Sequence, residues 1–158
     1  MKPVVYIETT IPSYYYDQRP SLQFEIARTK EWWDEERFDY ELITSEAVLE
    51  ELDNPQNPCR EESLRLLEGI PVVRTVPEVV QIADVHVARR VMPQTRSLDA
   101  LHLASACFYK ADFLLTWNCR HLANPNKLAA IRQVNAALGL LTPILTTPYD
   151  LRRVQEEE

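Results

Sequence analysis

The carboxylate of Glu8 stands where a ligand-binding acid would be useful. It ends the apolar run Val4–Ile7 and is followed by Thr9, Thr10 and Pro12. A run of β-branched and aromatic residues that a proline-containing turn closes predicts a buried parallel strand. Open α/β sheets bind ligands just outside the carboxyl ends of their strands, so we expect Glu8 at a ligand-binding edge.

A second acid, Asp99, lies on a helix predicted over residues 97–109 that is otherwise almost entirely apolar. Its apolar side chains cover nearly the whole circumference, which is typical of a helix buried on most sides. A buried carboxylate is costly unless it is paired or binds a metal. Asp99 is therefore a candidate site acid, although an acid also suits the first turn of any helix. His102 shares its stripe, where we expect a supporting or core role rather than metal ligation.

Three glutamates, Glu46, Glu50 and Glu51, occupy the helix predicted over residues 45–52. On a helical wheel Glu51 flanks the apolar stripe, whereas Glu46 and Glu50 share the opposite face, which should be solvated. Glu51 is therefore favoured over Glu46 as a site acid. A surface role for all three stays open.

Asn118 follows the strand predicted over residues 113–116 and should lie at the same edge as Glu8. Its amide oxygen can ligate a cation or fix a water, but asparagine is also a common turn residue, so both roles are open. Arg120 and His121 come next, and either can contact a phosphate.

Strands and helices alternate along the chain. Predicted strands cover residues 3–8, 40–44, 72–76, 113–116 and 144–146; predicted helices cover 21–38, 45–52, a short segment ending at 67, 78–91, 97–109, 125–138 and a segment after 148. This alternation predicts one domain over residues 1–158, a three-layer α/β/α sandwich with a central parallel sheet. The tail, about residues 150–158, should be frayed.

Composition narrows the function classes. The net charge of −7 argues against broad affinity for nucleic acid, but not against a nuclease, because metal-binding carboxylates add negative charge. With two glycines there is no glycine-rich phosphate loop, which disfavours a nucleotide-binding fold. The sequence has no membrane-length apolar stretch and no secretory signal, and its three cysteines lack metal-type spacing. We therefore expect a cytoplasmic protein with reduced thiols and no membrane partner.

Two aromatic clusters stand out. Tyr14, Tyr15 and Tyr16 follow the first acid and are interpreted either as core and interface packing or as a base-stacking platform. Trp32 and Trp33 are adjacent on a predicted helix, so we expect one of them to be partly exposed, at an apolar groove or a dimer contact.

Four segments, taken in order, resemble PIN-domain proteins of the kind found as the toxin in VapBC-type toxin–antitoxin pairs. They are residues 5–10 (VYIETT), 44–52 (TSEAVLEEL), 97–104 (SLDALHLA) and 114–121 (LLTWNCRH). The resemblance implies a PIN-like fold and metal-dependent cleavage of RNA phosphodiester bonds. It also implies an antitoxin partner and a homodimer.

By the same resemblance, Glu8, Glu51 and Asp99 hold Mg²⁺ or Mn²⁺, and Asn118 occupies the fourth site position. The family usually has Asp at the first position, the fourth is often acidic, and His121 stands where many relatives have an acid. About three negative charges remain, enough for one Mg²⁺. Two alternatives stay open: a catalytically weak or silent scaffold that binds RNA or a protein, and a small hydrolase or phosphatase, which the absence of an Asp-x-Asp nucleophile motif disfavours.

Overall fold

The computed structural model describes residues 1–94 and 98–152, which contain a central sheet of five parallel strands. The strands are β1 (Val4–Ile7), β2 (Glu41–Ser45), β3 (Val72–Val73), β4 (Phe113–Leu115) and β5 (Ile144–Thr146). Their order across the sheet is β3-β2-β1-β4-β5.

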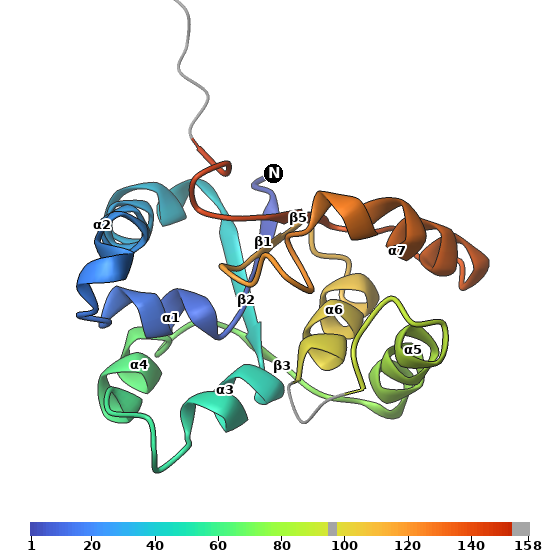
Figure 1. The fold of residues 1–158 in the computed structure, drawn as a ribbon, viewed down its shortest axis with the longest axis horizontal. Helices are drawn as coiled ribbons and strands as arrows, with labels where there is room; N and C mark the ends of the chain where they lie inside the picture. The colour runs from blue at the N-terminus through green and yellow to red at the C-terminus, as the bar shows by residue number, and fades with distance from the viewer. Residues whose placement is uncertain (95–97, 153–158) are drawn as a thin grey trace, which may run out of the picture.

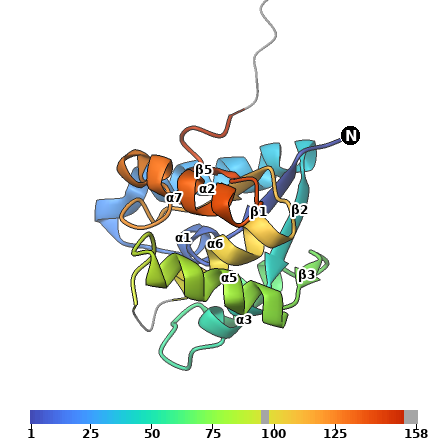
Figure 2. The same cartoon turned by 90° about the vertical axis from the view of Figure 1, so that its right-hand side faces the viewer.

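Helices cover both faces of this sheet. They are α1 (Thr10–Tyr15), α2 (Gln23–Glu31), α3 (Glu46–Leu52), α4 (Arg60–Leu66), α5 (Pro77–Ala88), α6 (Asp99–Phe108) and α7 (Pro125–Ala137). Helices α1 to α4 lie on one side of the sheet and α5 to α7 on the other (Figure 1, and Figure 2 from the side). The predicted three-layer α/β/α sandwich is confirmed.

Several helix ends follow local signals in the sequence. The Ser45 hydroxyl caps α3 by accepting the Val48 N–H at 3.2 Å, and Asn124 caps α7 in the same way. Prolines occupy the first positions of α5 and α7, where their missing N–H is not needed. Gly139 follows α7 with a φ of +72°, the left-handed conformation expected of a residue just past a helix end.

Strand β1 lies between β2 and β4, so the chain winds away from it in both directions. The pairing of Ile7 with Leu115 makes Glu8 and Thr116 the next residues of two neighbouring strands. In open α/β sheets, ligands bind in the crevice at this switch point, outside the carboxyl ends of the strands.

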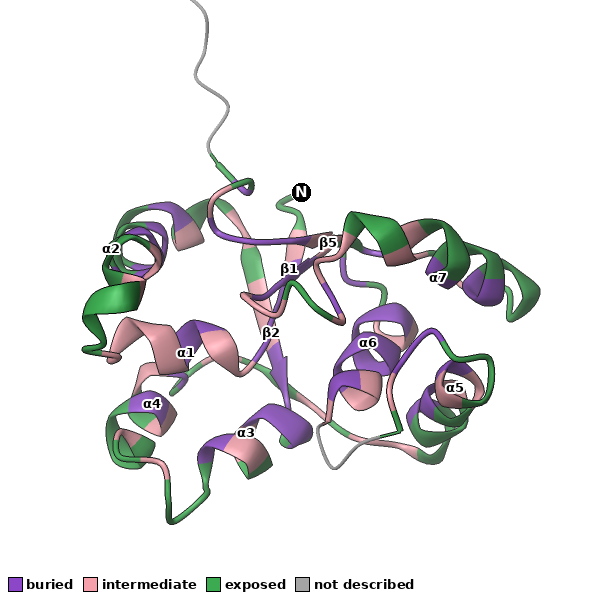
Figure 3. Cartoon of the chain, viewed as in Figure 1, coloured by how far each residue is buried: buried purple, intermediate pink, exposed green. Residues whose placement is uncertain are grey.

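The core lies on both sides of the sheet, where β1, β4 and most of α6 are buried (Figure 3). Leu103, Ala104 and Ala106 of α6 have no exposed surface, as its apolar circumference predicts. Within the described ranges, no helix combines the length and apolarity required to cross a bilayer.

Some local predictions are wrong. The residues after Glu8 form α1 rather than a turn, because Pro12 is the third residue of that helix, where no backbone donor is needed. The predicted strand 72–76 ends at Val73. Residues 148–152 do not continue into a helix, and the predicted tail beyond 152 and the helix start at Ser97 lie outside the described residues.

The helix predicted over residues 21–38 is divided, and both of its tryptophans are buried. A 3-10 turn precedes α2, and a π turn over Trp32–Glu36 follows it. This change of helical pitch alters the angle between neighbouring side chains, so that Trp32 and Trp33 are 0% and 2% exposed. Tyr40 stacks on Trp32. The two indoles therefore offer no exposed dimer contact.

A buried histidine gives the fold an expected sensitivity to acid. His86 Nε2 lies 2.6 Å from Asn135 Oδ1, while the Asn135 amide group donates to Thr142 and Cys107. The Asn135 oxygen is thus the acceptor, and the His86 ring is neutral with its proton on Nε2. Burial lowers the pKa of His86, partly offset by the Asn135 hydrogen bond.

Because this pKa is lowered in the folded state, the stabilisation that neutral His86 provides is present above about pH 6.5 and is lost as pH falls below it. We expect the free energy of unfolding to fall between pH 7 and pH 5, by at most about 1.4 kcal/mol per pH unit from this group. Urea unfolding measured at several pH values should show a weaker pH dependence of the free energy of unfolding for His86→Gln than for the wild type. An equal pH dependence in the two proteins would contradict this assignment.

Candidate active site

Glu8 lies at the end of β1, 3% exposed, and its carboxylate is held by groups from two neighbouring segments. The Thr10 N–H donates to Oε1 at 3.1 Å and to Oε2 at 3.0 Å. The hydroxyls of Thr10 and Thr116 donate to Oε2 at 2.8 and 2.9 Å. Four donor contacts fix the longer glutamate side chain in one position. Oε1 accepts only one of these contacts and keeps capacity for a cation.

The two threonine hydroxyls also tie this carboxylate to the turn after β4. Thr10 Oγ1 accepts the Trp117 N–H at 2.8 Å, and Thr116 Oγ1 accepts the Asn118 N–H at 2.9 Å. Each hydroxyl therefore accepts one backbone hydrogen and donates its own to Glu8. Burial raises the pKa of Glu8, although His102 and these hydrogen bonds oppose the shift. A cation brought close to such a buried carboxylate stabilises its charged form.

Glu51 reaches the same region from α3. Its Oε1 accepts the Thr9 hydroxyl at 2.9 Å and forms a short hydrogen bond with His102 Nε2. Burial alone would raise the pKa of Glu51, but the hydrogen bond and charge of His102, with a smaller effect of Thr9, lower it overall. Both contacts end on Oε1.

A hydrogen-bond chain behind His102 fixes its ring. His102 is 1% exposed, and its Nδ1 lies 2.8 Å from the Tyr6 hydroxyl, which in turn lies 2.6 Å from Ser45 Oγ. These residues come from α6, β1 and the end of β2. The imidazole is therefore a fixed support for Glu51.

Asp99, the first residue of α6, is 7% exposed and lies one turn before His102. Burial alone would lower the pKa of His102, but the hydrogen bond to Glu51 and the charges of Glu8, Glu51 and Asp99 raise it overall. All three predicted acids thus lie within electrostatic range of one imidazole. Figure 1 shows the start of α6 close to α3 near the end of the sheet.

The two remaining acids of α3 and the residue at the predicted fourth position do not hydrogen-bond to Glu8, Glu51 or Asp99 through their side chains. Glu46 and Glu50 are both exposed, and Glu46 accepts the Thr75 N–H at 2.9 Å. Asn118 Oδ1 accepts the His121 N–H at 3.0 Å, so its side chain closes the turn after β4. Asn118 therefore contacts the site through its backbone N–H and the Thr116 hydroxyl.

The donor set fits a hard divalent cation in its chemistry. Carboxylate oxygens are the preferred ligands of Mg²⁺ and Mn²⁺. Within residues 1–94 and 98–152, however, no three His, Cys, Asp or Glu side chains are grouped as a ready metal site. Since Thr9 and His102 both contact Glu51 Oε1, an ion held by this carboxylate would bind to Oε2.

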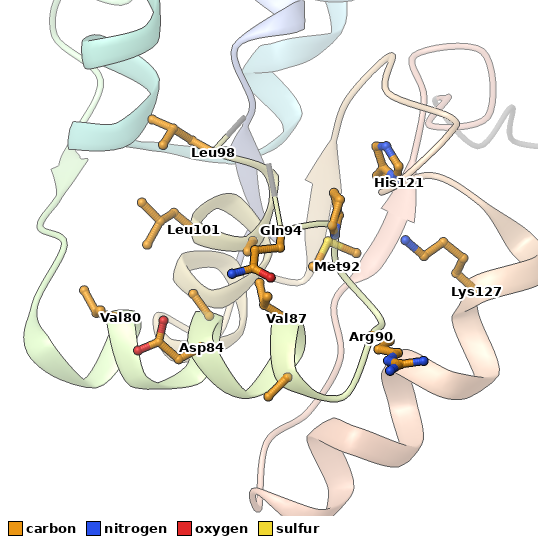
Figure 4. Close-up of a pocket in the computed structure, with 14 residues that line it drawn as sticks. Val80, Asp84, Val87, Arg90, Met92, Gln94, Leu98, Leu101, His121 and Lys127 are labelled. Atoms are coloured by element: carbon orange, nitrogen blue, oxygen red, sulfur yellow. The ribbon is translucent and has the colours of Figure 1, made fainter. Parts of the chain in front are cut away.

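A groove of about 1020 Å³ lies between α5, α6 and the start of α7, and Leu98 and Ala100 on either side of Asp99 in the sequence line it. Figure 4 shows Arg90, His121 and Lys127 along one side of it, with Leu98, the residue before Asp99, at its upper end. Burial lowers the pKa of Lys127, and the nearby Asp99 carboxylate partly opposes this shift. Basic groups of this kind can contact successive phosphates of a polyanion.

Sequence reasoning missed the threonines that hold the acids and the lysine beside Asp99. Thr9 and Thr10 directly follow the strand acid, and Thr116 ends β4. A hydroxyl at the carboxyl end of a parallel strand was the available signal. Lys127 gave none, because its proximity to the Asp99 charge arises only from the packing of α7.

The role of Thr116 can be tested by a substitution that keeps its shape. Thr116→Val removes the donor to Glu8 and leaves the Asn118 N–H without its acceptor. We expect a loss of about 1–3 kcal/mol in the free energy of unfolding, the typical cost of a buried polar group left unpaired. Urea unfolding measures it, with Thr116→Ser as the variant that keeps the hydroxyl. The prediction fails if Ser and Val destabilise equally.

Comparisons with known proteins bear on the fold. No protein-family model and no curated protein matches this sequence. Among solved structures, a chain of VapBC2 from Rickettsia felis, crystallised with a DNA fragment from its promoter, matches at 14% identity and a TM-score of 0.50, over 74% of this chain and 89% of that chain.

VapC20 of Mycobacterium tuberculosis, a sarcin–ricin-loop-cleaving toxin, matches at 13% identity and a TM-score of 0.56, over 80% of this chain and 94% of that chain. At these identities the similarity concerns the fold. The chain therefore has the PIN-domain fold of the VapC toxins.

Proposed function

We propose that this protein is a divalent-metal-dependent endoribonuclease and the toxin of a toxin–antitoxin pair. The observation that supports the proposal is that buried His102 hydrogen-bonds to Glu51 and is acted on by the charges of Glu8, Glu51 and Asp99, next to the switch point of a PIN-like sheet. The similar fold of VapC20, a sarcin–ricin-loop-cleaving toxin, supports RNA as the substrate class.

In the proposed reaction Glu8, Glu51 and Asp99 hold one Mg²⁺ or Mn²⁺. When bound, the ion supplies neutralisation of the charge on the scissile phosphate and favours ionisation of the attacking water. Thr10 and Thr116 keep Glu8 in place, so the carboxylate does not need to reorganise during the reaction.

The remaining groups position the acids and the substrate. Thr9 and His102 orient Glu51, and Asn118 acts through the turn that it closes and through Thr116. Arg90, His121 and Lys127 contact phosphates of the RNA along the groove of Figure 4. An antitoxin chain and a second copy of this chain are the proposed protein partners, and the cytoplasm is the proposed location.

The experiment that tests this function is incubation of the metal-free protein with a panel of RNAs, with and without Mg²⁺ or Mn²⁺. We expect cleavage that depends on the ion and stops with EDTA. RNA binding without cleavage under any ion would favour a silent scaffold. The specific observation behind that second candidate is that Glu51 is turned onto His102.

A further inference from the structure

A second pocket lies beside the candidate site, between α2, the start of α7 and the segment after β5. Its volume of about 640 Å³ is in the range of about 300–1,000 Å³ that ligand pockets occupy. Tyr14, Trp117 and Tyr149 line it, together with the acids Glu25 and Asp150. Neither the metal chemistry nor the phosphate contacts proposed above use this pocket.

The aromatic side of the pocket consists of rings that pack on one another. The rings of Tyr14 and Trp117 stack with centroids 5.6 Å apart and an interplanar angle of 11°, and Tyr149 meets Trp117 edge-on at 4.9 Å. The Trp117 indole N–H donates to Thr29 Oγ1 at 2.8 Å, which fixes the orientation of the indole. Proteins that bind single-stranded nucleic acid commonly stack bases on aromatic side chains.

The polar side of the pocket accepts hydrogen bonds. Glu25 Oε2 is buried and accepts no hydrogen bond from the described residues, while burial and the neighbouring Glu25 carboxylate raise the pKa of Tyr149. A buried acceptor left unpaired is costly, so a ligand that donates to it would be favoured. With Asp150 on the same wall, the pocket repels a phosphate but suits a neutral base that presents N–H groups.

Guanine is the base that fits this chemistry. Its Watson–Crick edge carries two adjacent donors, N1–H and the N2 amino group, which one carboxylate can accept together. Adenine and cytosine place a ring acceptor next to their amino group, and uracil has one N–H between two carbonyl oxygens. A carboxylate therefore meets a lone pair with each of these three bases.

The pocket is connected directly to the candidate site. The Trp117 backbone N–H donates to Thr10 Oγ1 at 2.8 Å, and that hydroxyl donates to Glu8 Oε2 at 2.8 Å. One side of Trp117 thus faces the pocket while its backbone supports the acid. Trp117 and Thr10 therefore join the pocket to Glu8 through two hydrogen bonds.

We infer that this pocket binds a guanine base of the RNA next to the scissile phosphate, with Tyr14 and Trp117 as the stacking wall and Glu25 as the acceptor. The inference rests on the proposed ribonuclease function and adds a preference for guanine at the cleavage site. It assigns to Tyr14 the base-stacking role that the sequence left open.

Calorimetric titration of the full chain with GMP, AMP, CMP and UMP, in EDTA, tests the pocket without any cleavage. We expect GMP to bind about 10-fold more tightly than the other three, the discrimination typical of a bidentate base contact. Glu25→Gln should remove this preference, because its amide places a donor against N1–H. The matched control is Glu62→Gln, an exposed acid of α4, which should keep it.

Equal binding of the four nucleotides, or a GMP preference that survives Glu25→Gln, would overturn the inference. If Glu25→Gln does not fold, Tyr14→Leu tests the stacking wall instead, with binding of all four nucleotides expected to weaken about 10-fold; unchanged GMP binding by Tyr14→Leu would overturn the inference. Mapping of RNA ends should then show guanine next to the cleavage sites of the wild type and not of Glu25→Gln. GMP preference without RNA cleavage would support the pocket and reject the proposed function.

Discussion

Asp99→Asn is expected to lower metal-dependent RNA cleavage by about 10²–10³-fold or more, while the protein stays folded. The substitution keeps the shape of the side chain but removes one of about three negative charges proposed to hold the ion. Loss of one group that stabilises transition-state charge typically costs this much. Because Asp99 is buried at the start of α6, loss of the carboxylate should cost little stability.

Cleavage of a labelled RNA at several Mg²⁺ concentrations measures this effect, with circular dichroism to show that the fold is kept. The matched control is Asp34→Asn, an exposed aspartate whose contact is the Tyr15 hydroxyl, and it should cleave as the wild type does. Full activity of Asp99→Asn would reject this residue as a site acid.

Arg28→Met should produce the largest loss of stability, about 3–5 kcal/mol in the free energy of unfolding. The Arg28 guanidinium is 10% exposed and forms an ion pair with the buried Glu36. It also donates to the carbonyl oxygens of Pro148 at 2.6 Å and Leu151 at 3.2 Å, so it joins α2 to the segment that carries Tyr149. Methionine keeps most of the apolar stem but supplies none of these donors.

Urea unfolding of Arg28→Met at neutral pH measures this loss as a lower transition midpoint with an unchanged slope. Arg60→Met is the control, since Arg60 and Asp53 form a half-exposed pair that should contribute about 1 kcal/mol or less. If the urea midpoint of Arg28→Met differs from that of the wild type by no more than the midpoint of Arg60→Met does, Arg28 does not anchor the C-terminal segment.

The order and type of the main elements could be predicted because their signals are local. Apolar runs marked β1, β2 and β4, and the apolar circumference of α6 marked a buried helix. Helix α1 could not be predicted in this way, because a proline after a strand indicates a turn unless it is known to lie in the first turn of a helix, as Pro12 does. The burial of both Trp32 and Trp33 depends on a π turn, for which the sequence has no local signal.

The acids of the candidate site could be proposed from sequence because each stands at a strand end or on a buried helix face. Their mutual support could not, since it depends on contacts over long sequence separations. Thr116 donates to Glu8 from another strand, and the Tyr6 hydroxyl reaches His102 from β1. These partners are defined only once β1 and β4 pair in register.

The central claim is that Glu8, Glu51 and Asp99 share one divalent ion, and Mn²⁺ binding followed by electron paramagnetic resonance tests it most directly. We predict that the wild type binds one Mn²⁺ per chain, in competition with Mg²⁺. The variant with Glu8→Gln, Glu51→Gln and Asp99→Asn together should bind none at this site. Mn²⁺ binding of the same affinity and stoichiometry by the wild type and this variant would contradict the claim.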